Sequence, residues 1–422
     1  MTDQGNGGRR DGRVRVVITG MGAITPMGHS VDDLWQGLVE GRSAIDYFTK
    51  LDATKYPTKF GGEVRGFDPT RYMDAKRARR MEPFSQFAVA AAKQALEDSR
   101  LDMDGVDPER IGVVFGTAVG GLSATERATR RVVDGKRPSA FYLTSTMPNA
   151  AAFHLANLFQ LHGYNITITT ACAAGTQSVG EGAEVIRRGA ADLVLAGGTE
   201  SSTSDVAMAG FVSMRAFSTR NDNPQAACRP FDKDRDGFVG SEGSGVLLLE
   251  RLDHALARGA RIYAEVLGFG ATSDAFHLAA PDPEAKGAIR TIRWALQDAG
   301  LNPEEVDYIN AHGTSTPLGD VSETLAIKTS LGEHAYDVPV SSTKSMLGHC
   351  FGAAGAVEAI ATALTIHHQV IHPTINYETP DPACDLDYVP NEAREAEVRI
   401  GLSESIGLGG QDACLALGRF DG

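Results

Sequence analysis

The chain has 422 residues, 42% of them hydrophobic and 22% charged, which is the composition of an ordinary globular protein with two or three domains or one large duplicated domain. A net charge of −14 argues against nucleic acid as a general partner, because a phosphate backbone repels an acidic surface. The five cysteines are widely spaced and include no Cys-x-x-Cys pair, so the sequence indicates neither a disulfide framework nor a zinc site. They predict a reducing, cytoplasmic location.

The chain begins with a polar, glycine-rich segment, residues 1–13, which we expect to be a mobile tail because it lacks the apolar core of a signal peptide. No apolar run reaches the length of a membrane span. Residues 14–19 predict a first strand, closed by the Gly-Met-Gly sequence at residues 20–22. Residues 31–40 have helical spacing after an Asp-containing start.

Farther along, residues 84–99 predict an Ala-rich helix and residues 111–115 a strand, followed by a glycine-rich loop at residues 116–121. Such a loop can cradle phosphate groups. Here it lacks the Lys-Ser/Thr of a P-loop and the G-x-G-x-x-G spacing, so a dinucleotide site is only weakly indicated.

The stretch at residues 166–177 organises the rest of the chain. A β-branched run predicts a buried strand, the small residues from Ala173 predict a helix start, and Cys172 stands at the turn between them. A sulfur at a helix N-terminus meets unpaired N–H groups and the positive end of the helix dipole, which stabilise a nucleophilic thiolate. The alternative is a buried core cysteine, and this stretch alone does not decide between the two.

An internal repeat indicates a duplication. The Ala-Leu-Glu-Asp-Ser-Arg-Leu sequence at residues 95–101 returns as Ala-Leu-Gln-Asp-Ala-Gly-Leu at residues 295–301, and each copy is followed by a proline-acidic turn, a strand and Gly-Thr. The boundary is expected near residues 259–263, which gives an N-terminal half, residues 14–260, and a C-terminal half, residues 261–422. Strands alternate with helices in both halves, so an α/β fold with mainly parallel sheets is predicted.

The second half offers partners for a nucleophile. Residues 307–316 and 341–349 each predict a strand that leads to a histidine, His312 and His349, and Lys344 comes five positions before the second. Side chains at the carboxyl ends of strands face the ligand crevice of open α/β sheets, so we expect these residues to meet Cys172. A structural role is the simpler interpretation for His29, His254 and His334.

At these residues the chain resembles the β-ketoacyl-[acyl-carrier-protein] synthases, elongating condensing enzymes of the thiolase fold. The motifs that carry the resemblance are Thr-Ala-Cys-Ala-Ala-Gly, Asn-Ala-His-Gly-Thr-Ser-Thr and Ser-Thr-Lys-Ser-Met-Leu-Gly-His, at residues 170–175, 310–316 and 342–349. The similarity is greatest to the bacterial type II fatty-acid enzyme. It implies a thiolase-like, duplicated α/β/α/β/α fold of five layers that works as a dimer.

The resemblance also implies an acyltransferase mechanism. Cys172 would take the acyl chain from an acyl carrier protein, and His312 and His349 would hold the malonyl thioester carbonyl during a decarboxylative Claisen condensation. Lys344 and Glu358 would form a buried pair that positions His349.

Further roles follow from the same resemblance. Thr314 and Thr316 would contact the phosphopantetheine arm, and the backbone N–H groups of Cys172 and Leu408 would bind the thioester oxygen. No cofactor or metal is implied beyond the phosphopantetheine of the carrier. The implied partners are that carrier and an identical subunit or a homologous chain-length subunit, with no nucleic acid and no membrane span.

The chain departs from the family pattern near its C-terminus. The family usually reads Gly-Phe-Gly-Gly-Thr-Asn, whereas residues 407–412 read Gly-Leu-Gly-Gly-Gln-Asp. The glycines keep the backbone freedom of this loop, but the side chains differ. The departure leaves two pathways open, fatty-acid synthesis and a specialised type II polyketide or polyene pathway in which a ketosynthase often pairs with an inactive chain-length subunit. A non-catalytic role for this chain itself is disfavoured, because the Cys, His and Lys residues are all present.

Two basic clusters are candidates for docking the acidic carrier: one contains Lys76, Arg77, Arg79 and Arg80, and the other Lys136 and Arg137. A solvated charged face is the alternative interpretation of each. By the same resemblance, Val119 limits the depth of the acyl pocket and Phe211 gates it.

Overall fold

The computed structural model describes residues 9–10, 12–201 and 204–422, so most of the predicted tail lies outside the described residues. A sheet of ten strands, in the order β12-β11-β15-β16-β10-β3-β9-β8-β6-β7, runs through the molecule. The N-terminal half contributes β3 (Val16–Ile24), β6 (Ile111–Gly116), β7 (Asn165–Ile168), β8 (Leu193–Glu200) and β9 (Gly243–Arg251). The C-terminal half contributes β10 (Ala264–Ser273), β11 (Tyr308–Asn310), β12 (Val340–Ser341), β15 (Ile400–Gly407) and β16 (Gln411–Gly418).

The two halves repeat one pattern of strand pairing. From the centre outward, β3-β9-β8-β6-β7 pair antiparallel, antiparallel, parallel and parallel, and β10-β16-β15-β11-β12 pair in the same sequence. An antiparallel pairing of β3 with β10 joins them. The prediction of mainly parallel sheets is therefore wrong for the inner strands. The short link from β15 to β16 allows only a hairpin, which is antiparallel by geometry.

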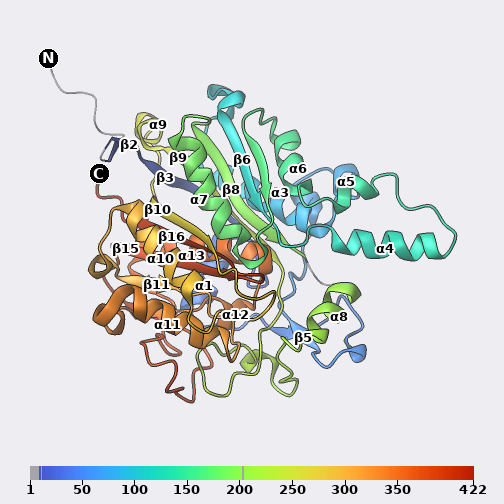
Figure 1. The fold of residues 1–422 in the computed structure, drawn as a ribbon. Coiled ribbons are helices and arrows are strands. Elements are labelled where there is room, and N and C mark those ends of the chain that lie inside the picture. The colour runs from blue at the N-terminus through green and yellow to red at the C-terminus, as the bar shows by residue number, and fades with distance from the viewer. Residues whose placement is uncertain (1–8, 11, 202–203) are drawn as a thin grey trace.

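Helices form the remaining layers (Figure 1). α7 (Ala174–Arg187) and α13 (Ala354–His368) pack against each other between the two sheet halves. α3 (Pro83–Ser99) and α6 (Ala150–Phe159) cover the outer face of the first half, and α10 (Lys286–Ala299) and α11 (Gly319–Leu331) cover the second. The five-layered α/β/α/β/α prediction is confirmed, and the two copies of the sequence repeat form the equivalent outer helices α3 and α10.

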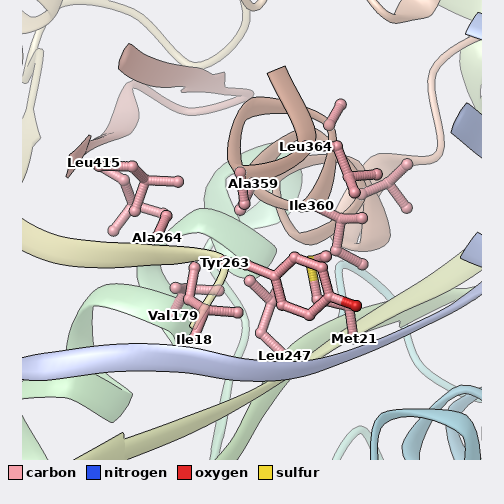
Figure 2. Packing of buried hydrophobic residues seen from close by; sticks show 14 of the residues in the cluster. Ile18, Met21, Val179, Leu247, Tyr263, Ala264, Ala359, Ile360, Leu364 and Leu415 are labelled. Atoms are coloured by element: carbon pink, nitrogen blue, oxygen red, sulfur yellow. The ribbon is translucent and has the colours of Figure 1, made fainter. Parts of the chain in front are cut away.

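The central core seals these layers together (Figure 2). Buried side chains from β3, β9, β10 and β16 meet those of α7 and α13, among them Ile18, Leu247, Val179, Ile360 and Leu415. Each of these five is fully buried, and burying one aliphatic side chain of this size stabilises a fold by roughly 1.5–3 kcal/mol. The helices that carry the site are thus fixed from both sides.

Several local predictions need correction. Strand β3 does not end at the Gly-Met-Gly sequence but continues to Ile24, because Gly20 and Gly22 let the backbone of α3 approach so closely that a Cβ would overlap its carbonyl oxygens. Strand β7 is not buried: it is the edge of the sheet, and Ile166 is 40% exposed. The segment before His349 is strand only at β12, and α12 (Lys344–Leu347) follows.

The remaining elements lie at the periphery. α1 (Val31–Val39) matches its prediction, capped by the Ser30 side chain. α4 (Leu122–Val133) and α5 (Tyr142–Thr146) form an arm that projects from the body (Figure 1). Other short elements are α2 (Ala75–Ala78), α8 (Asp205–Ser213), α9 (Leu252–Ala257), and the paired strands β1 (Arg9–Arg10) with β2 (Arg13–Val14), β4 (Asp46–Tyr47) with β5 (Phe60–Gly61), and β13 (Val370–Ile371) with β14 (Arg394–Glu395). Among the described helices, none is both long and apolar enough to cross a membrane.

Candidate active site

Cys172 lies where the sequence predicts it, in the short turn Ala171–Ala173 between β7 and the start of α7. The turn is sharp, since Ala171 has a φ of 49°, a left-handed conformation that is costly for a residue with a side chain. The Cys172 sulfur lies 2.9 Å from Nε2 of His349, and the backbone N–H of Leu408 also donates to it.

The resting sulfur is a thiol. Burial raises the pKa of Cys172 to about 11, although the Leu408 N–H and the Lys344 charge act in the opposite direction. The loss of solvation therefore opposes the stabilisation of a thiolate by backbone N–H groups and the helix dipole that the sequence predicts. At the observed distance, a neutral His349 can accept the S–H proton as the sulfur attacks.

His312 and His349 come from different elements but share one pocket wall. His312 follows β11 and His349 follows α12, and their rings stand perpendicular with centroids 5.3 Å apart. Burial, reinforced by the nearby Lys344 charge, holds the pKa of both imidazoles well below the usual value. Both rings are therefore neutral near pH 7, which suits them to donate N–H hydrogen bonds to a carbonyl or enolate oxygen.

Lys344 forms a hydrogen-bonded ion pair with Glu358 of α13, and both side chains are 2% exposed. A lone lysine at this depth would be very costly, and the carboxylate offsets that cost. The pair also fixes a positive charge beside the two histidines, and this charge is a physical reason why they stay neutral.

Glu323 is a site residue that the sequence analysis missed. It is buried on α11, and its two carboxylate oxygens accept the backbone N–H groups of His312 and Gly313, at 2.6 and 2.7 Å. This grip fixes the loop that carries His312. A buried acid eleven residues from a histidine has no motif of its own, and the only signal was its inward position on a helix.

The catalytic candidates open onto a cavity of about 590 Å³. Cys172, His312 and His349 line it together with Thr314, Thr316, Val119, Phe211 and Leu408, so the structure brings the predicted pocket residues to one place. Phe211 of α8 stacks on Phe351, with ring centroids 4.9 Å apart. The hydroxyls of Thr314 and Thr316 lie 3.2 Å apart at the wall that continues from His312.

Two loops border the cavity beside the nucleophile. One is residues 407–410, in which Gly409 and Gly410 adopt φ values of 91° and 72° that glycine allows, and Leu408 between Gly407 and Gly409 is 41% exposed. The other is residues 274–281, whose Asp274, Ala279, Ala280 and Pro281 also line the cavity. The backbone N–H of Asp274 donates to the Gly410 carbonyl at 2.7 Å, so the two loops are joined.

The basic clusters do not line the cavity. Lys76, Arg79 and Arg80 are exposed on and beside α2, where the Arg80 guanidinium lies 4.5 Å from the ring centre of Phe141. Lys136 and Arg137 are exposed on the segment after α4, at the end of the projecting arm (Figure 1). Their role in docking stays a prediction.

The duplicated fold and the Cys-His-His pocket define a class, and the chain belongs to the β-ketoacyl synthase family. The signature of the β-ketoacyl synthase N-terminal domain matches residues 13–255, and that of the C-terminal domain matches residues 263–378.

Individual relatives match nearly the whole chain. The chain is 49% identical over 408 residues to 3-oxoacyl-[acyl-carrier-protein] synthase 2 of Synechocystis sp., which covers 96% of this chain and 98% of the relative. It is 46% identical to the enzyme of the same name from Coxiella burnetii, over 96% of this chain and 99% of that one. Among solved structures, the ishigamide ketosynthase/chain length factor superposes with a TM-score of 0.91 at 38% identity, covering 97% of this chain and all of that one.

A second solved structure is a type II polyketide synthase acyl-carrier protein in complex with its ketosynthase bound to the hexaketide. It superposes with a TM-score of 0.90 at 35% identity, again over 97% of this chain and 100% of that one. These solved ketosynthase structures thus share the architecture of this chain over nearly its whole length.

Proposed function

We propose that this protein is a β-ketoacyl-[acyl-carrier-protein] synthase that condenses malonyl units with a Cys172-bound acyl chain. The observation that carries the proposal is the 2.9 Å approach of the Cys172 sulfur to His349 Nε2, at the base of a cavity that His312 also lines. Nucleophile, proton acceptor and carbonyl-binding groups are together in one pocket, as acyl transfer requires.

In the first step, the Cys172 sulfur attacks the thioester carbonyl of an acyl carrier. The new C–S bond forms as the carrier thiolate leaves, and the proton of Cys172 passes by way of His349 to the departing sulfur. The oxygen that becomes negative in between is held by backbone N–H groups at Cys172 and Leu408, which are pre-oriented by the turn and the loop.

In the second step, malonyl carrier binds with its thioester carbonyl against His312 and His349. The C–C bond to the carboxylate breaks, carbon dioxide leaves, and the electron pair forms an enolate. The N–H group of His312 stabilises this enolate, together with that of His349 once its proton is carried on Nε2. The enolate carbon attacks the Cys172 thioester and the C–S bond breaks. The expelled thiolate takes up a proton from solvent, which restores the thiol. Lys344 and Glu358 act indirectly, by keeping the histidines neutral and in place.

The partners are an acyl carrier protein and a second, homologous subunit. Support for a second subunit comes from the edge strand β7, where Asn165 and Ile166 are exposed, and from the arm, where Val133 and Leu143 are 81% and 66% exposed. Unpaired strand edges and clustered apolar side chains are the usual features of a surface that another chain covers. The second subunit is either identical or a homologous chain-length factor, as in the ishigamide relative.

Between the two pathways, one observation favours a specialised polyketide or polyene substrate. Leu408 stands where the family usually has phenylalanine, and its smaller, non-planar side chain leaves more room beside Cys172 for a rigid or unsaturated chain. The chain is 49% and 46% identical to the two 3-oxoacyl-[acyl-carrier-protein] synthase 2 relatives over 96% of its length. This similarity supports the condensation chemistry but does not distinguish the fatty-acid pathway from the polyketide pathway.

The Cys172→Ala variant tests the proposal. It should lose acyl transfer and condensation completely and still decarboxylate malonyl carrier, because His312 and His349 remain. Condensed product from this variant would remove Cys172 from its role. Loss of decarboxylation as well, in a protein that melts like the wild type, would show that the histidines do not act alone on malonyl carrier.

A further inference from the structure

The carboxyl groups of Asp412 and Asp274 converge on one spot at the edge of the 407–410 loop. Asp412 is the first residue after Gln411 on β16, and Asp274 directly follows β10, the neighbouring strand. A carboxylate oxygen of Asp274 fills the space where a Cβ on residue 287 would stand, and Oδ2 of Asp412 lies 2.8 Å from the same point. Gly287, near the start of α10, has no side chain and therefore leaves room for the two carboxyl groups.

Each of the two residues also holds one end of the 407–410 loop. Oδ1 of Asp412 accepts the backbone N–H of Gly407 at 3.3 Å, and the backbone N–H of Asp274 donates to the carbonyl of Gly410 at 2.7 Å. The pair therefore joins the two ends of the loop that carries Leu408, and with it the N–H that points at the Cys172 sulfur.

Two ionised carboxylates in this position would repel each other. With both ionised, Oδ2 of Asp412 is buried and has no hydrogen-bond donor among the described residues. Asp412 itself is 2% exposed, so water does not replace the missing donor cheaply. One proton shared by the two carboxyls removes the repulsion and supplies that donor.

We propose that Asp412 and Asp274 share a proton and form a latch that holds the 407–410 loop closed over Cys172. They are positioning residues, since neither touches the nucleophile. The inference deepens the proposed function and rests on it for its catalytic consequence, namely that the latch sets how readily the loop moves aside for an acyl chain.

The surrounding charges favour retention of this proton. Burial, followed by the charge of Asp274 and a hydrogen bond with it, raises the pKa of Asp412 to about 8. From β15, the buried Glu404 adds a further acid nearby, and the Asp412 charge helps to raise its pKa in turn. The Gly407 N–H and, from α10, Arg290 act in the opposite direction, while Lys286 at the helix start pairs with Glu284.

The sign of the pH dependence follows from these groups. In an open loop the Asp412 carboxyl is solvated and ionises near the ordinary aspartate value, whereas the closed latch keeps its proton up to about pH 8. Closure therefore binds a proton, and it weakens as pH rises from the ordinary value towards 8 and then levels off. The limiting slope is about tenfold in the closed-to-open ratio per pH unit.

Hydrogen–deuterium exchange of the peptide that contains residues 405–412 measures the latch without any catalysis. After correction for the intrinsic exchange rate, protection in wild type should fall by up to about tenfold per unit between pH 6 and 8 and stay level above pH 8. In Asp412→Asn the amide donates to the Asp274 carboxylate without a shared proton, so protection should remain high and independent of pH. Asp412→Ala should be unprotected throughout.

Gly287→Ala provides an independent control, since the added methyl displaces the Asp274 carboxyl and leaves both acids in the chain. It should lower protection at pH 6 to the level of Asp412→Ala. If Asp412→Ala fails to fold, Asp274→Asn replaces it and should be as pH-independent as Asp412→Asn. A wild-type profile that is flat from pH 6 to 8, or an Asp412→Asn profile with the wild-type slope, would overturn the latch.

The same preparations also test the proposed function separately. If Cys172 is not acylated by any carrier but the exchange profile follows the prediction, the latch stands and the proposed function fails. If Cys172 is acylated normally and the exchange profile is flat, the proposed function stands and the latch fails.

Discussion

The two halves of the molecule are copies in architecture but not in chemistry. In each, a tight turn leads into a central helix: Ala171–Ala173 before α7, and Phe351–Ala353 before α13. The first turn follows the edge strand β7, and the second follows the edge strand β12 and the short helix α12. The first residues of the two turns have nearly the same left-handed φ, 49° at Ala171 and 47° at Phe351. Equivalent backbone strain is thus retained at both turns.

What differs is the side chain at the centre of each turn. The first half places Cys172 there and the second half Gly352. A Cβ at position 352 would overlap the backbone nitrogen of Ala118, so the second turn is closed by the glycine-rich loop that carries Val119. The loops after the equivalent strands β6 and β11 also differ: the first places Val119 at the cavity wall, and the second places His312 there. A duplicated scaffold thus carries one nucleophile and, facing it, one pair of histidines.

The largest effect should come from removing the histidines that the second half contributes to the site. His312→Ala or His349→Ala should each slow decarboxylation of malonyl carrier by ~10²–10³-fold, the cost of losing one oxyanion donor. Because His349 also faces the Cys172 sulfur, only His349→Ala should slow acylation of Cys172 to a comparable degree. His334→Ala is the matched control, because its ring bonds the Val306 carbonyl and does not line the cavity. Equal acylation rates in the His312 and His349 variants would contradict this division.

Removing the charge behind the histidines should have the next largest effect. Lys344→Met leaves Glu358 buried without its partner, which should cost ~3–5 kcal/mol in the free energy of unfolding. Adding Glu358→Gln should recover part of this loss, as denaturant unfolding of the single and double variants can show. Since the Lys344 charge lowers the pKa of both histidines, the acid limb of the pH–rate profile should move to higher pH in both variants. An unmoved acid limb would show that burial alone keeps the rings neutral.

A smaller effect is expected at the loop of the second half that covers the nucleophile of the first. If Leu408 widens the space beside Cys172, Leu408→Phe should slow acylation by an unsaturated or β-substituted chain by ~10-fold relative to a saturated straight chain. Leu408→Met keeps the volume without a ring and serves as the control. The measurement is the ratio of the two acylation rates. An unchanged ratio would contradict a role of Leu408 in accepting unsaturated chains and would favour a saturated, straight-chain substrate.

The smallest effect is expected at the basic clusters, which both lie in the first half. Arg79→Glu with Arg80→Glu should raise the apparent KM for carrier-bound substrates several-fold and leave small acyl thioesters unchanged, because surface charges steer association. Arg399→Glu with Arg419→Glu, near the opposite end of β15 from the 407–410 loop, is the matched double reversal. An equal loss for both substrate types would make the Arg79 cluster structural.

Much of this arrangement was predictable from the sequence because its signals are local. The turn at Cys172, the helix of α3 and the loop leading to His312 each depend on a few consecutive residues. The internal repeat also predicted that the halves would match, and α3 and α10 do occupy equivalent layers.

The missed features depend on residues that meet only in the fold. Glu323 grips the His312 loop from a helix, and the Asp274–Asp412 pair forms across two strands, so no spacing in the sequence announces either. The sequence also could not show that desolvation raises the pKa of Cys172, because a motif shows its helix N-terminus but not the groups packed around its sulfur. Strand β7 was predicted to be buried because its β-branched run reads the same at a sheet edge as in a core.

The central claim is that the first half alone carries the covalent intermediate. Incubation of the protein with an acyl carrier, followed by intact mass and peptide mapping, should show one acyl group per chain, on Cys172. Cys228, Cys350, Cys384 and Cys414 are buried and should stay unmodified. Acylation of any of these four, or none at all on Cys172 with every carrier supplied, would contradict the account.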